Sequence, residues 1–317
     1  MMLHQSARVS IFALLVALLL ASCGTLSPPS SIAPVAPPVA PAPMPSLSHI
    51  FVIVLENKSY DQALNGSDAP YLSTLAHQYG LATNYTGITH PSLPNYIALT
   101  GGSTFGITSD CTDCFVNAAN LVDELETAGK TWKAYMESMP RPCFIGNDGD
   151  LYRQRHNPFI YYDDIRTNPQ RCNQIVPFSQ FATDLQANAL PNFVWITPNM
   201  CDDAHDCALD ASDSWLKTWV PQILASSAWR DRGALFITFD EGDRALTAGT
   251  AFGGGRIATV VLSPLGKGAY RSPLGYIHYA LLRTIEDAWH LPPLNEAAHT
   301  PSMSDFFIPS TVTGPNS

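Results

Sequence analysis

Two pairs of polar residues stand directly after apolar runs of this 317-residue chain, and both pairs consist of metal-ligand side chains. Glu56-Asn57 follows one run, and Asp240-Glu241 follows the other. Unbroken apolar runs rich in β-branched residues are typical of strands buried on both faces of a parallel sheet. Open α/β sheets bind ligands beyond the carboxyl ends of their strands. Carboxylates gathered there need a cation or a shared proton between them, so the two pairs predict a metal site.

A serine that lies between the two pairs in the chain has the surroundings of a nucleophile. Ser92 lies in the segment His90-Pro-Ser-Leu-Pro-Asn95, after an extended stretch and before a predicted helix. Backbone N–H groups and the helix dipole at such a position favour an alkoxide and an anionic substrate. A lone serine in a turn is more often a helix cap, but beside a metal its hydroxyl is a candidate nucleophile. No Gly-x-Ser-x-Gly pattern surrounds it, which argues against a hydrolase of acyl esters.

The elements that must position these residues alternate along the chain. Strands are predicted at residues 50–55, 131–136, 192–197, 234–239 and 257–262, and helices at residues 70–79, 120–129, 178–188, 213–226 and 276–289. This alternation indicates an α/β fold, a three-layer α/β/α sandwich around a mostly parallel central sheet. Residues 140–173 break the pattern with proline, glycine, asparagine and two cysteines. A loop of that length is usually functional or tied down.

The N-terminal segment is not expected to belong to this fold. Arg8 precedes a short apolar run and small residues before Cys23, the pattern of a secretory signal at residues 1–22. The Cys23 context resembles the bacterial lipobox, which implies lipid attachment there; the alternative is a plain signal peptide with an incidental cysteine. Residues 23–46 are rich in proline, alanine and serine and predict an extended tether. Residues 47–317 would then form one domain, held in the bacterial cell envelope or else secreted.

Six further cysteines remain in the predicted domain. An even number of cysteines in an exported chain predicts disulfides. Proximity in the sequence favours the pairs Cys111–Cys114, Cys143–Cys172 and Cys201–Cys207, although other pairings are open. Cys111-x-x-Cys114 is also compatible with a redox or zinc motif, but no second Cys-x-x-Cys accompanies it.

The overall charge excludes one class of partner. The net charge is −10, and the chain has no basic stripe that would bind phosphates of a polymer. We therefore expect no nucleic acid as partner. A small anionic substrate held locally by a metal is compatible with this charge.

Six segments of the chain carry a family resemblance when they are taken in order. They are Glu56-Asn57, Thr89-His-Pro-Ser-Leu-Pro-Asn-Tyr96, Arg155-His-Asn-Pro158, Pro198-Asn199 with His205-Asp206, Asp240-Glu241-Gly242, and the run from Tyr276 to Glu286. Together they resemble the bacterial phosphoesterase family of secreted acid phosphatases and non-zinc phospholipases C. That family belongs to the alkaline-phosphatase-like superfamily, whose fold the resemblance implies for this chain.

The resemblance also implies a role for each matched position. The metal site would comprise Glu56, Asn57, Ser92, Asp240 and Glu241, with Ser92 as the nucleophile that becomes a phosphoserine. The active-site histidines would be His156, His205 and His278, and His156 or His278 would protonate the leaving alcohol. On the substrate side we expect Asn95, Arg155 and Asp206, with Asp206 also orienting His205.

Ordinary structural alternatives stay open for several of these residues. Asn57 is also compatible with a cap, Glu241 with a solvent-facing carboxylate, and His278 with a core histidine of an amphipathic helix. The cluster that includes Asp202, Asp203, Asp206 and Asp210 is typical of a solvated face. The oxygen ligands expected here favour one hard divalent cation such as Ca²⁺, Mg²⁺ or Mn²⁺.

The sequence thus predicts an exported phosphoric ester hydrolase, a phosphomonoesterase of the acid phosphatase kind. The alternatives within the family are a phospholipase C-type phosphodiesterase and a phosphoinositide phosphatase. The alternative of another class is a non-catalytic, metal-binding surface lipoprotein. The expected partners are a small phosphate ester or a lipid headgroup, and a membrane through the lipid on Cys23.

Overall fold

The structure is a computed structural model that describes residues 43–243 and 253–309. The predicted signal peptide, Cys23 and nearly all of the predicted tether lie outside the described residues. Eight strands form one sheet in the described part of the chain. They are β1 (Ile50–Leu55), β2 (Gly80–Thr86), β3 (Trp132–Met136), β4 (Ile175–Pro177), β5 (Phe193–Thr197), β6 (Ala234–Phe239), β7 (Arg256–Leu262) and β8 (Arg271–Ile277).

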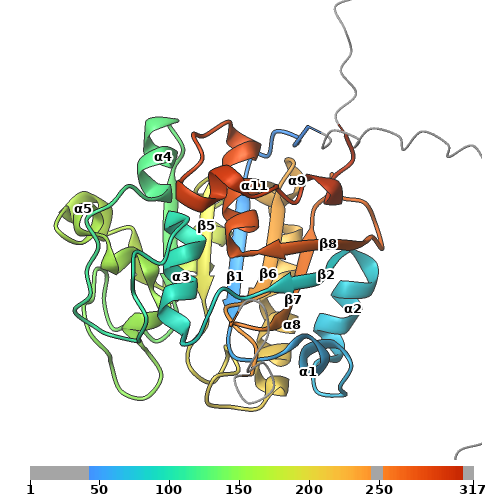
Figure 1. The fold of residues 1–317 in the computed structure, drawn as a ribbon, viewed down its shortest axis with the longest axis horizontal. Helices are drawn as coiled ribbons and strands as arrows, with labels where there is room; N and C mark the ends of the chain where they lie inside the picture. The colour runs from blue at the N-terminus through green and yellow to red at the C-terminus, as the bar shows by residue number, and fades with distance from the viewer. Residues whose placement is uncertain (1–42, 244–252, 310–317) are drawn as a thin grey trace, which may run out of the picture. The chain divides into compact units, whose positions relative to one another are not determined.

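The sheet is mostly parallel and has the strand order β4-β3-β5-β1-β6-β7-β2-β8 (Figure 1). The central strand β1 pairs in parallel with β5 on one side and with β6 on the other. Strand β7 runs antiparallel to both of its neighbours, β6 and β2. The predicted α/β class with a mostly parallel sheet is therefore confirmed. The direction of β7 was not predicted, because a buried apolar run reports burial and not strand direction.

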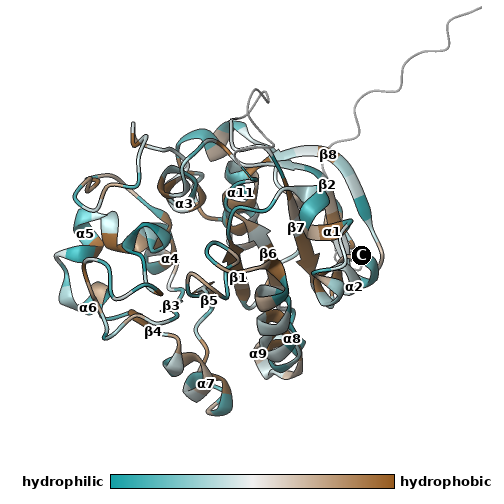
Figure 2. Ribbon diagram, turned by 90° about the horizontal axis from the view of Figure 1, so that it is seen from below, coloured by the Kyte–Doolittle hydropathy of each residue, from teal (hydrophilic) through white to brown (hydrophobic). Residues whose placement is uncertain are grey.

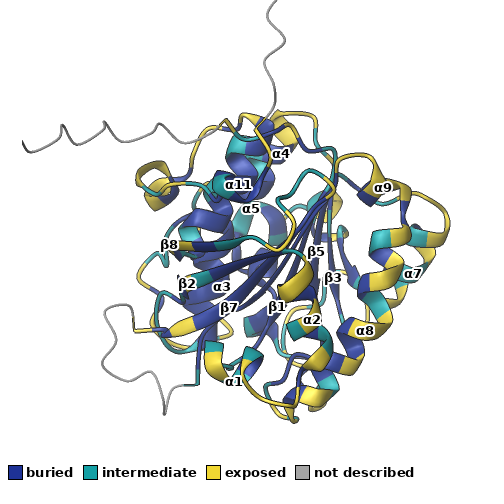
Figure 3. Ribbon diagram, turned by 90° about the vertical axis from the view of Figure 1, so that its right-hand side faces the viewer, coloured by how far each residue is buried: buried dark blue, intermediate teal, exposed yellow. Residues whose placement is uncertain are grey.

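Helices cover both faces of the sheet and make the predicted outer layers. In the described part of the chain, the α-helices of five or more residues are α1 (Tyr60–Leu64), α2 (Pro70–Gln78), α3 (Ser92–Gly101), α4 (Leu121–Thr127), α7 (Ser179–Gln186), α8 (Leu209–Ala225) and α11 (His278–Trp289). Helices α3 and α11 lie on one face, and α2 and α8 lie on the other (Figures 2 and 3). Every residue of α3 is buried, so the helix expected to carry Ser92 is fixed by packing on all sides.

The central strands provide the hydrophobic core between these layers. All residues of β1, β5 and β6 are buried, and Figure 2 shows apolar strands between the more polar helical layers. The edge strand β8 was missed by the sequence pattern, which assigned Tyr276 and Ile277 to the last helix. Helix α11 instead begins at His278. Strand β8 contains Pro273 and Gly275, which a central strand rarely accepts but an edge strand tolerates.

The long segment at residues 140–173 is built from short helical turns. They are η1 (Gln154–His156), η2 (Pro158–Tyr161), α5 (Asp163–Arg166) and α6 (Pro169–Cys172). The disulfide Cys143–Cys172 ties this segment together, as predicted. The predicted pairs Cys111–Cys114 and Cys201–Cys207 are confirmed as well. Across residues 43–243 and 253–309, no helix has the length and hydropathy needed to cross a membrane.

Candidate active site

The carboxyl ends of β1 and β6 bring Glu56 and Asp240 together. The two strands pair with Leu55 opposite Phe239, so the next residue of each strand leaves the sheet at the same edge. Both carboxylates are fully buried. The N–H of Asn57 donates to Asp240 Oδ1 at 3.2 Å, and its side-chain amide donates to Glu56 Oε2 at 3.3 Å. The backbone of Asn57 has a φ of 56°, a left-handed conformation that asparagine adopts more readily than most residues.

Ser92 enters this cluster as the first residue of α3. Its Oγ donates to Glu56 Oε2 at 3.0 Å, and its side chain is buried. Burial raises the pKa of Asp240, and the nearby Ser92 side chain partly opposes that rise. The preceding Pro91 supplies no side-chain cap to the helix. The N-terminal N–H groups of α3 therefore need acceptors from elsewhere.

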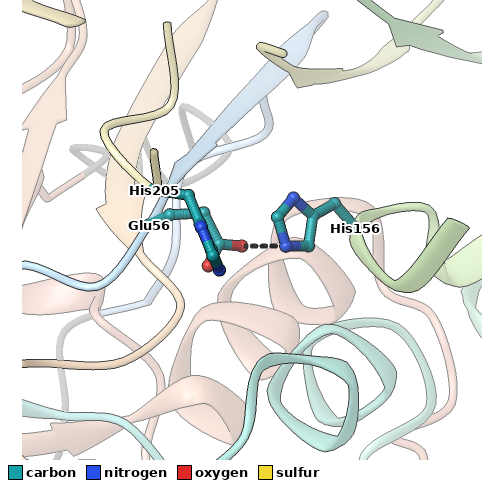
Figure 4. Close-up of side chains that lie close together, drawn as sticks. All are labelled: Glu56, His156 and His205. Carbon is teal, nitrogen blue, oxygen red and sulfur yellow. Dashed lines mark ion pairs between the residues drawn. The ribbon is translucent and has the colours of Figure 1, made fainter. Parts of the chain in front are cut away.

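His156 reaches the cluster from η1 and faces the Glu56 carboxylate (Figure 4). Its Nε2 lies 3.2 Å from Glu56 Oε1, and its Nδ1 lies 3.2 Å from Asp203 Oδ2. Asp203 comes from the loop after β5, and its carbonyl accepts the N–H of Glu56 at 2.8 Å. The ring of His156 stacks on Tyr96 of α3 at 5.4 Å between centroids. A carboxylate behind one ring nitrogen orients a histidine and fixes which nitrogen faces the site.

His205 lies beside His156 and comes from the loop after β5, which also carries Asp203. The disulfide Cys201–Cys207 closes this loop. Arg155 Nη2 donates to His205 Nε2 at 3.0 Å, and Nδ1 of His205 lies 2.6 Å from Asp206 Oδ1. Because the guanidinium can only donate, a neutral His205 carries its proton on Nδ1, toward Asp206. The expected contact between Asp206 and His205 is thus present in the structure.

Burial controls the electrostatics of the cluster. It raises the pKa of Glu56 well above its ordinary value, and the neighbouring Asp240 and Asp203 raise this pKa further. Burial also raises the pKa of Asp240 to about 7. The pKa of His156 is lowered well below its ordinary value, again mainly by burial. Buried carboxylates at this spacing are unfavourable as anions unless a cation or a proton compensates them.

The donor set fits a divalent cation. Ligand atoms of Glu56, His156 and His205 lie within 4.8 Å of one another. Among the described residues, no hydrogen bond engages Asp240 Oδ2, although this atom is buried. Oxygen and imidazole donors together suit Zn²⁺ and Fe²⁺ as well as Mn²⁺. Two histidine nitrogens thus lie near the expected carboxylate ligands, although the segments that carry them are distant in sequence.

Glu241 and Asn95 contact each other beside the turn that precedes Ser92. The Glu241 carboxylate pairs with His90 Nδ1 at 2.8 Å and accepts from Asn95 Nδ2 at 3.0 Å. Asn95 Oδ1 in turn accepts the N–H groups of Ile88 and Thr89 at 2.8 and 3.1 Å. We expected a metal ligand and a phosphate-binding amide. These contacts hold the turn that precedes Ser92, and the expected roles of both residues stay predictions.

His278 contacts the end of β6 from the start of α11. The side chain is fully buried at the start of α11. Its Nε2 contacts the backbone carbonyl of Asp240, and its Nδ1 lies 3.2 Å from the Tyr85 hydroxyl. Burial lowers its pKa to about 4. These contacts place His278 behind the Asp240 backbone, and its expected role in protonating the leaving group stays a prediction.

Three residues in or beside the site were not assigned to it from the sequence. Tyr96 donates its hydroxyl to Glu56 Oε1 at 2.6 Å. Asp203 was assigned to a solvated acidic face but is fully buried behind His156. Lys58 Nζ donates to the carbonyl of Ala204 at 2.6 Å. Only Tyr96 carried a usable signal, since it lies one helical turn after Ser92 and faces the same side.

Comparison with known proteins identifies relatives over most of this domain. The model of the Phosphoesterase family matches residues 62–292. An acid phosphatase of Aspergillus fumigatus is 32% identical over 263 residues, which cover 78% of this chain and 56% of that protein. A phosphatidylinositol-3-phosphatase of Mycobacterium tuberculosis is 29% identical over 273 residues, which cover 85% of this chain and 86% of that protein. The chain thus spans little more than half the length of the fungal relative.

Solved structures agree with the fold. A Vibrio parahaemolyticus protein of the alkaline phosphatase superfamily superposes with a TM-score of 0.56 at 14% sequence identity. The match covers 81% of this chain and 72% of that protein. The predicted alkaline-phosphatase-like fold is confirmed by this likeness.

Proposed function

The chain belongs to the phosphoesterase family, and from this membership and the geometry of its site we propose that it hydrolyses phosphoric monoesters as an acid phosphatase. One observation carries the proposal. The hydroxyl of Ser92, at the start of a helix, donates to the buried Glu56 carboxylate at 3.0 Å beside Asp240. A binding protein has no need of a hydroxyl in such a cluster, whereas phosphoryl transfer through a covalent intermediate requires one. The similarity to an acid phosphatase over 78% of the chain supports the same activity.

Glu56, Asp240 and His156 would hold one divalent cation, with Asn57 as a further donor beside them. Bound there, the cation would act as a Lewis acid that stabilises negative charge on the Ser92 oxygen and on the phosphoryl oxygens. The support for this assignment is the donor set, two buried carboxylates and an imidazole backed by Asp203.

The side chains themselves divide the proton transfers. Ser92 Oγ forms the bond to phosphorus while the bond between phosphorus and the ester oxygen breaks. The hydroxyl proton passes to Glu56 Oε2, to which Ser92 already donates at 3.0 Å, and from this carboxyl group to the departing alcohol. Arg155 and His205 lie at the edge of the same cluster and would bind the phosphoryl oxygens. Water then attacks phosphorus, and the transfers run in reverse to release phosphate and restore Ser92.

A second candidate is a phosphatase acting on inositol lipids. The observation that favours it is the similar length of the two chains, since the match covers 86% of the mycobacterial phosphatidylinositol-3-phosphatase. The fungal acid phosphatase is matched over 56%. Both activities cleave a phosphomonoester, so the same residues would serve either substrate.

The test is hydrolysis by the purified protein of p-nitrophenyl phosphate, bis-p-nitrophenyl phosphate and phosphatidylinositol 3-phosphate. We expect monoesterase activity that Ser92→Ala abolishes. Ser212→Ala is the matched control, because Ser212 is also a fully buried helical serine but lies in α8. Monoesterase activity that survives Ser92→Ala would refute the mechanism. A preference for the diester would favour a phospholipase C-type enzyme.

We also propose that the protein is exported and anchored by a lipid on Cys23. Support comes from the three disulfides, since disulfides form and persist in oxidising compartments. Metabolic labelling with radioactive palmitate tests the anchor. We expect label in the wild-type chain and none in Cys23→Ala, and an equal label in both would refute the proposal.

A further inference from the structure

We propose that Asp110 is a positioning residue that couples the nucleophile helix to Arg155 and thereby sets the affinity of the site for phosphate. The inference rests on the proposed function, because it assumes that Arg155 binds a phosphoryl oxygen. Asp110 stands in the loop that follows α3, and this loop returns to the N-terminus of the same helix.

The first contact of Asp110 is with the nucleophile helix. Its Oδ1 accepts the N–H of Leu93, the residue after Ser92, at 3.0 Å. Helix N-termini leave N–H groups without intrahelical acceptors, and Pro91 at the cap position supplies no side-chain acceptor. The side chain of Asp110, 17 residues after Leu93 in the chain, is therefore the acceptor that an N-cap side chain normally provides.

The second contact is with Arg155. The other oxygen of Asp110 lies 3.6 Å from Arg155 Nε. At its far end, the guanidinium donates through Nη2 to His205 at 3.0 Å. Arg155 is therefore held on two sides, and within residues 43–243 and 253–309 no hydrogen bond engages its Nη1. One carboxylate thus joins the residue next to Ser92 and the guanidinium expected to bind phosphate.

The loop that carries Asp110 is anchored independently of both contacts. The hydroxyl of Tyr161 donates to the carbonyl of Cys111 at 2.8 Å. The amide of Gln154 donates to the carbonyl of Thr112 at 2.9 Å. The disulfide of Cys111 closes the turn. Both anchoring side chains flank Arg155 in the chain, so the carboxylate and the guanidinium are fixed relative to each other.

The decisive variant is Asp110→Asn in the full chain. Asparagine retains an oxygen that can accept from Leu93 and loses the charge that faces Arg155. Asp113→Asn is the matched control, because it removes the same charge from the same disulfide loop. Asp113 is exposed, and in the described residues it makes no hydrogen bond or ion pair.

The measurements are titration calorimetry with inorganic phosphate and steady-state kinetics on p-nitrophenyl phosphate. For Asp110→Asn we expect the Kd of phosphate and the KM to rise about fivefold, the upper range for a solvent-accessible ion pair, with kcat and Tm close to those of the wild type. Asp113→Asn should match the wild type in all four. In an Arg155→Met background, Asp110→Asn should add no further loss, because its effect runs through the guanidinium.

Two outcomes would overturn the inference. Phosphate binding by Asp110→Asn that equals or exceeds that of the wild type would show that the carboxylate does not position Arg155. A fivefold loss that persists in the Arg155→Met background would show that it acts through another group. A wild-type protein that binds phosphate but does not hydrolyse the monoester would instead refute the proposed function, and the binding comparison would still test Asp110.

Discussion

Tyr96→Phe removes one hydroxyl from the candidate active site and leaves the rest of the side chain in place. The hydroxyl donates to Glu56 Oε1 at 2.6 Å, and the ring stacks on His156. Phenylalanine keeps the stacked ring and loses only the donor. The tyrosine hydrogen bond lowers the pKa of Glu56 against the opposing effect of burial, so the variant holds Glu56 less firmly as a carboxylate.

The magnitude follows from the type of contact. A hydrogen bond to a charged group contributes about 1.5–3 kcal/mol. If the transition state needs Glu56 as an oriented carboxylate, kcat/KM on p-nitrophenyl phosphate falls about 10- to 150-fold. The matched control is Tyr135→Phe, which removes a hydroxyl that donates to Asp184 at 2.7 Å, a tyrosine–carboxylate contact made by β3 and α7.

Both variants lose a buried hydrogen bond of the same kind, so their thermal stabilities should fall by similar amounts. Only Tyr96→Phe should lose activity. A kcat/KM for Tyr96→Phe that equals the value for Tyr135→Phe would refute the assignment of Glu56 as an active-site carboxylate.

Three further predictions concern the metal, its support and the pH dependence of stability. Asp203→Asn removes the carboxylate behind His156 and should weaken Mn²⁺ binding about 10- to 100-fold in titration calorimetry; unchanged affinity would contradict the assigned support. Dialysis against a chelator should abolish hydrolysis and lower the Tm, with recovery on adding Mn²⁺ or Zn²⁺, and full activity after metal removal would exclude a metal requirement. Burial raises the pKa of Glu286, fully buried in α11, from 4.5 to about 7. The folded state therefore holds this proton more tightly than the unfolded state does. Its contribution to stability is complete below pH 4.5 and is lost as the pH rises to about 7, at most about 3 kcal/mol. Urea unfolding should show that loss in the wild type and a smaller one in Glu286→Gln; parallel pH profiles would contradict it.

The sequence by itself determined the fold class and part of the site. Apolar runs such as residues 50–55 and 234–239 indicate buried strands, because an unbroken run has no polar face to present to water. The residue that follows such a strand must lie at the sheet edge, which is why Glu56 and Asp240 were found together. The disulfide pairs were predictable from sequence separation. Cysteines close in the chain, such as Cys201 and Cys207, are also close in space and can pair with each other.

Only the tertiary structure decided which side chains meet beyond the strand ends. His156 and Asp203 come from a long irregular segment and from a loop after β5, and no local pattern encodes their contact with Glu56. Glu241 follows Asp240 in the chain, yet its carboxylate pairs with His90 and Asn95. The physical reason is that the spacing of apolar residues along the chain indicates which residues are buried. The contacts that a buried residue makes depend instead on packing between segments far apart in the sequence.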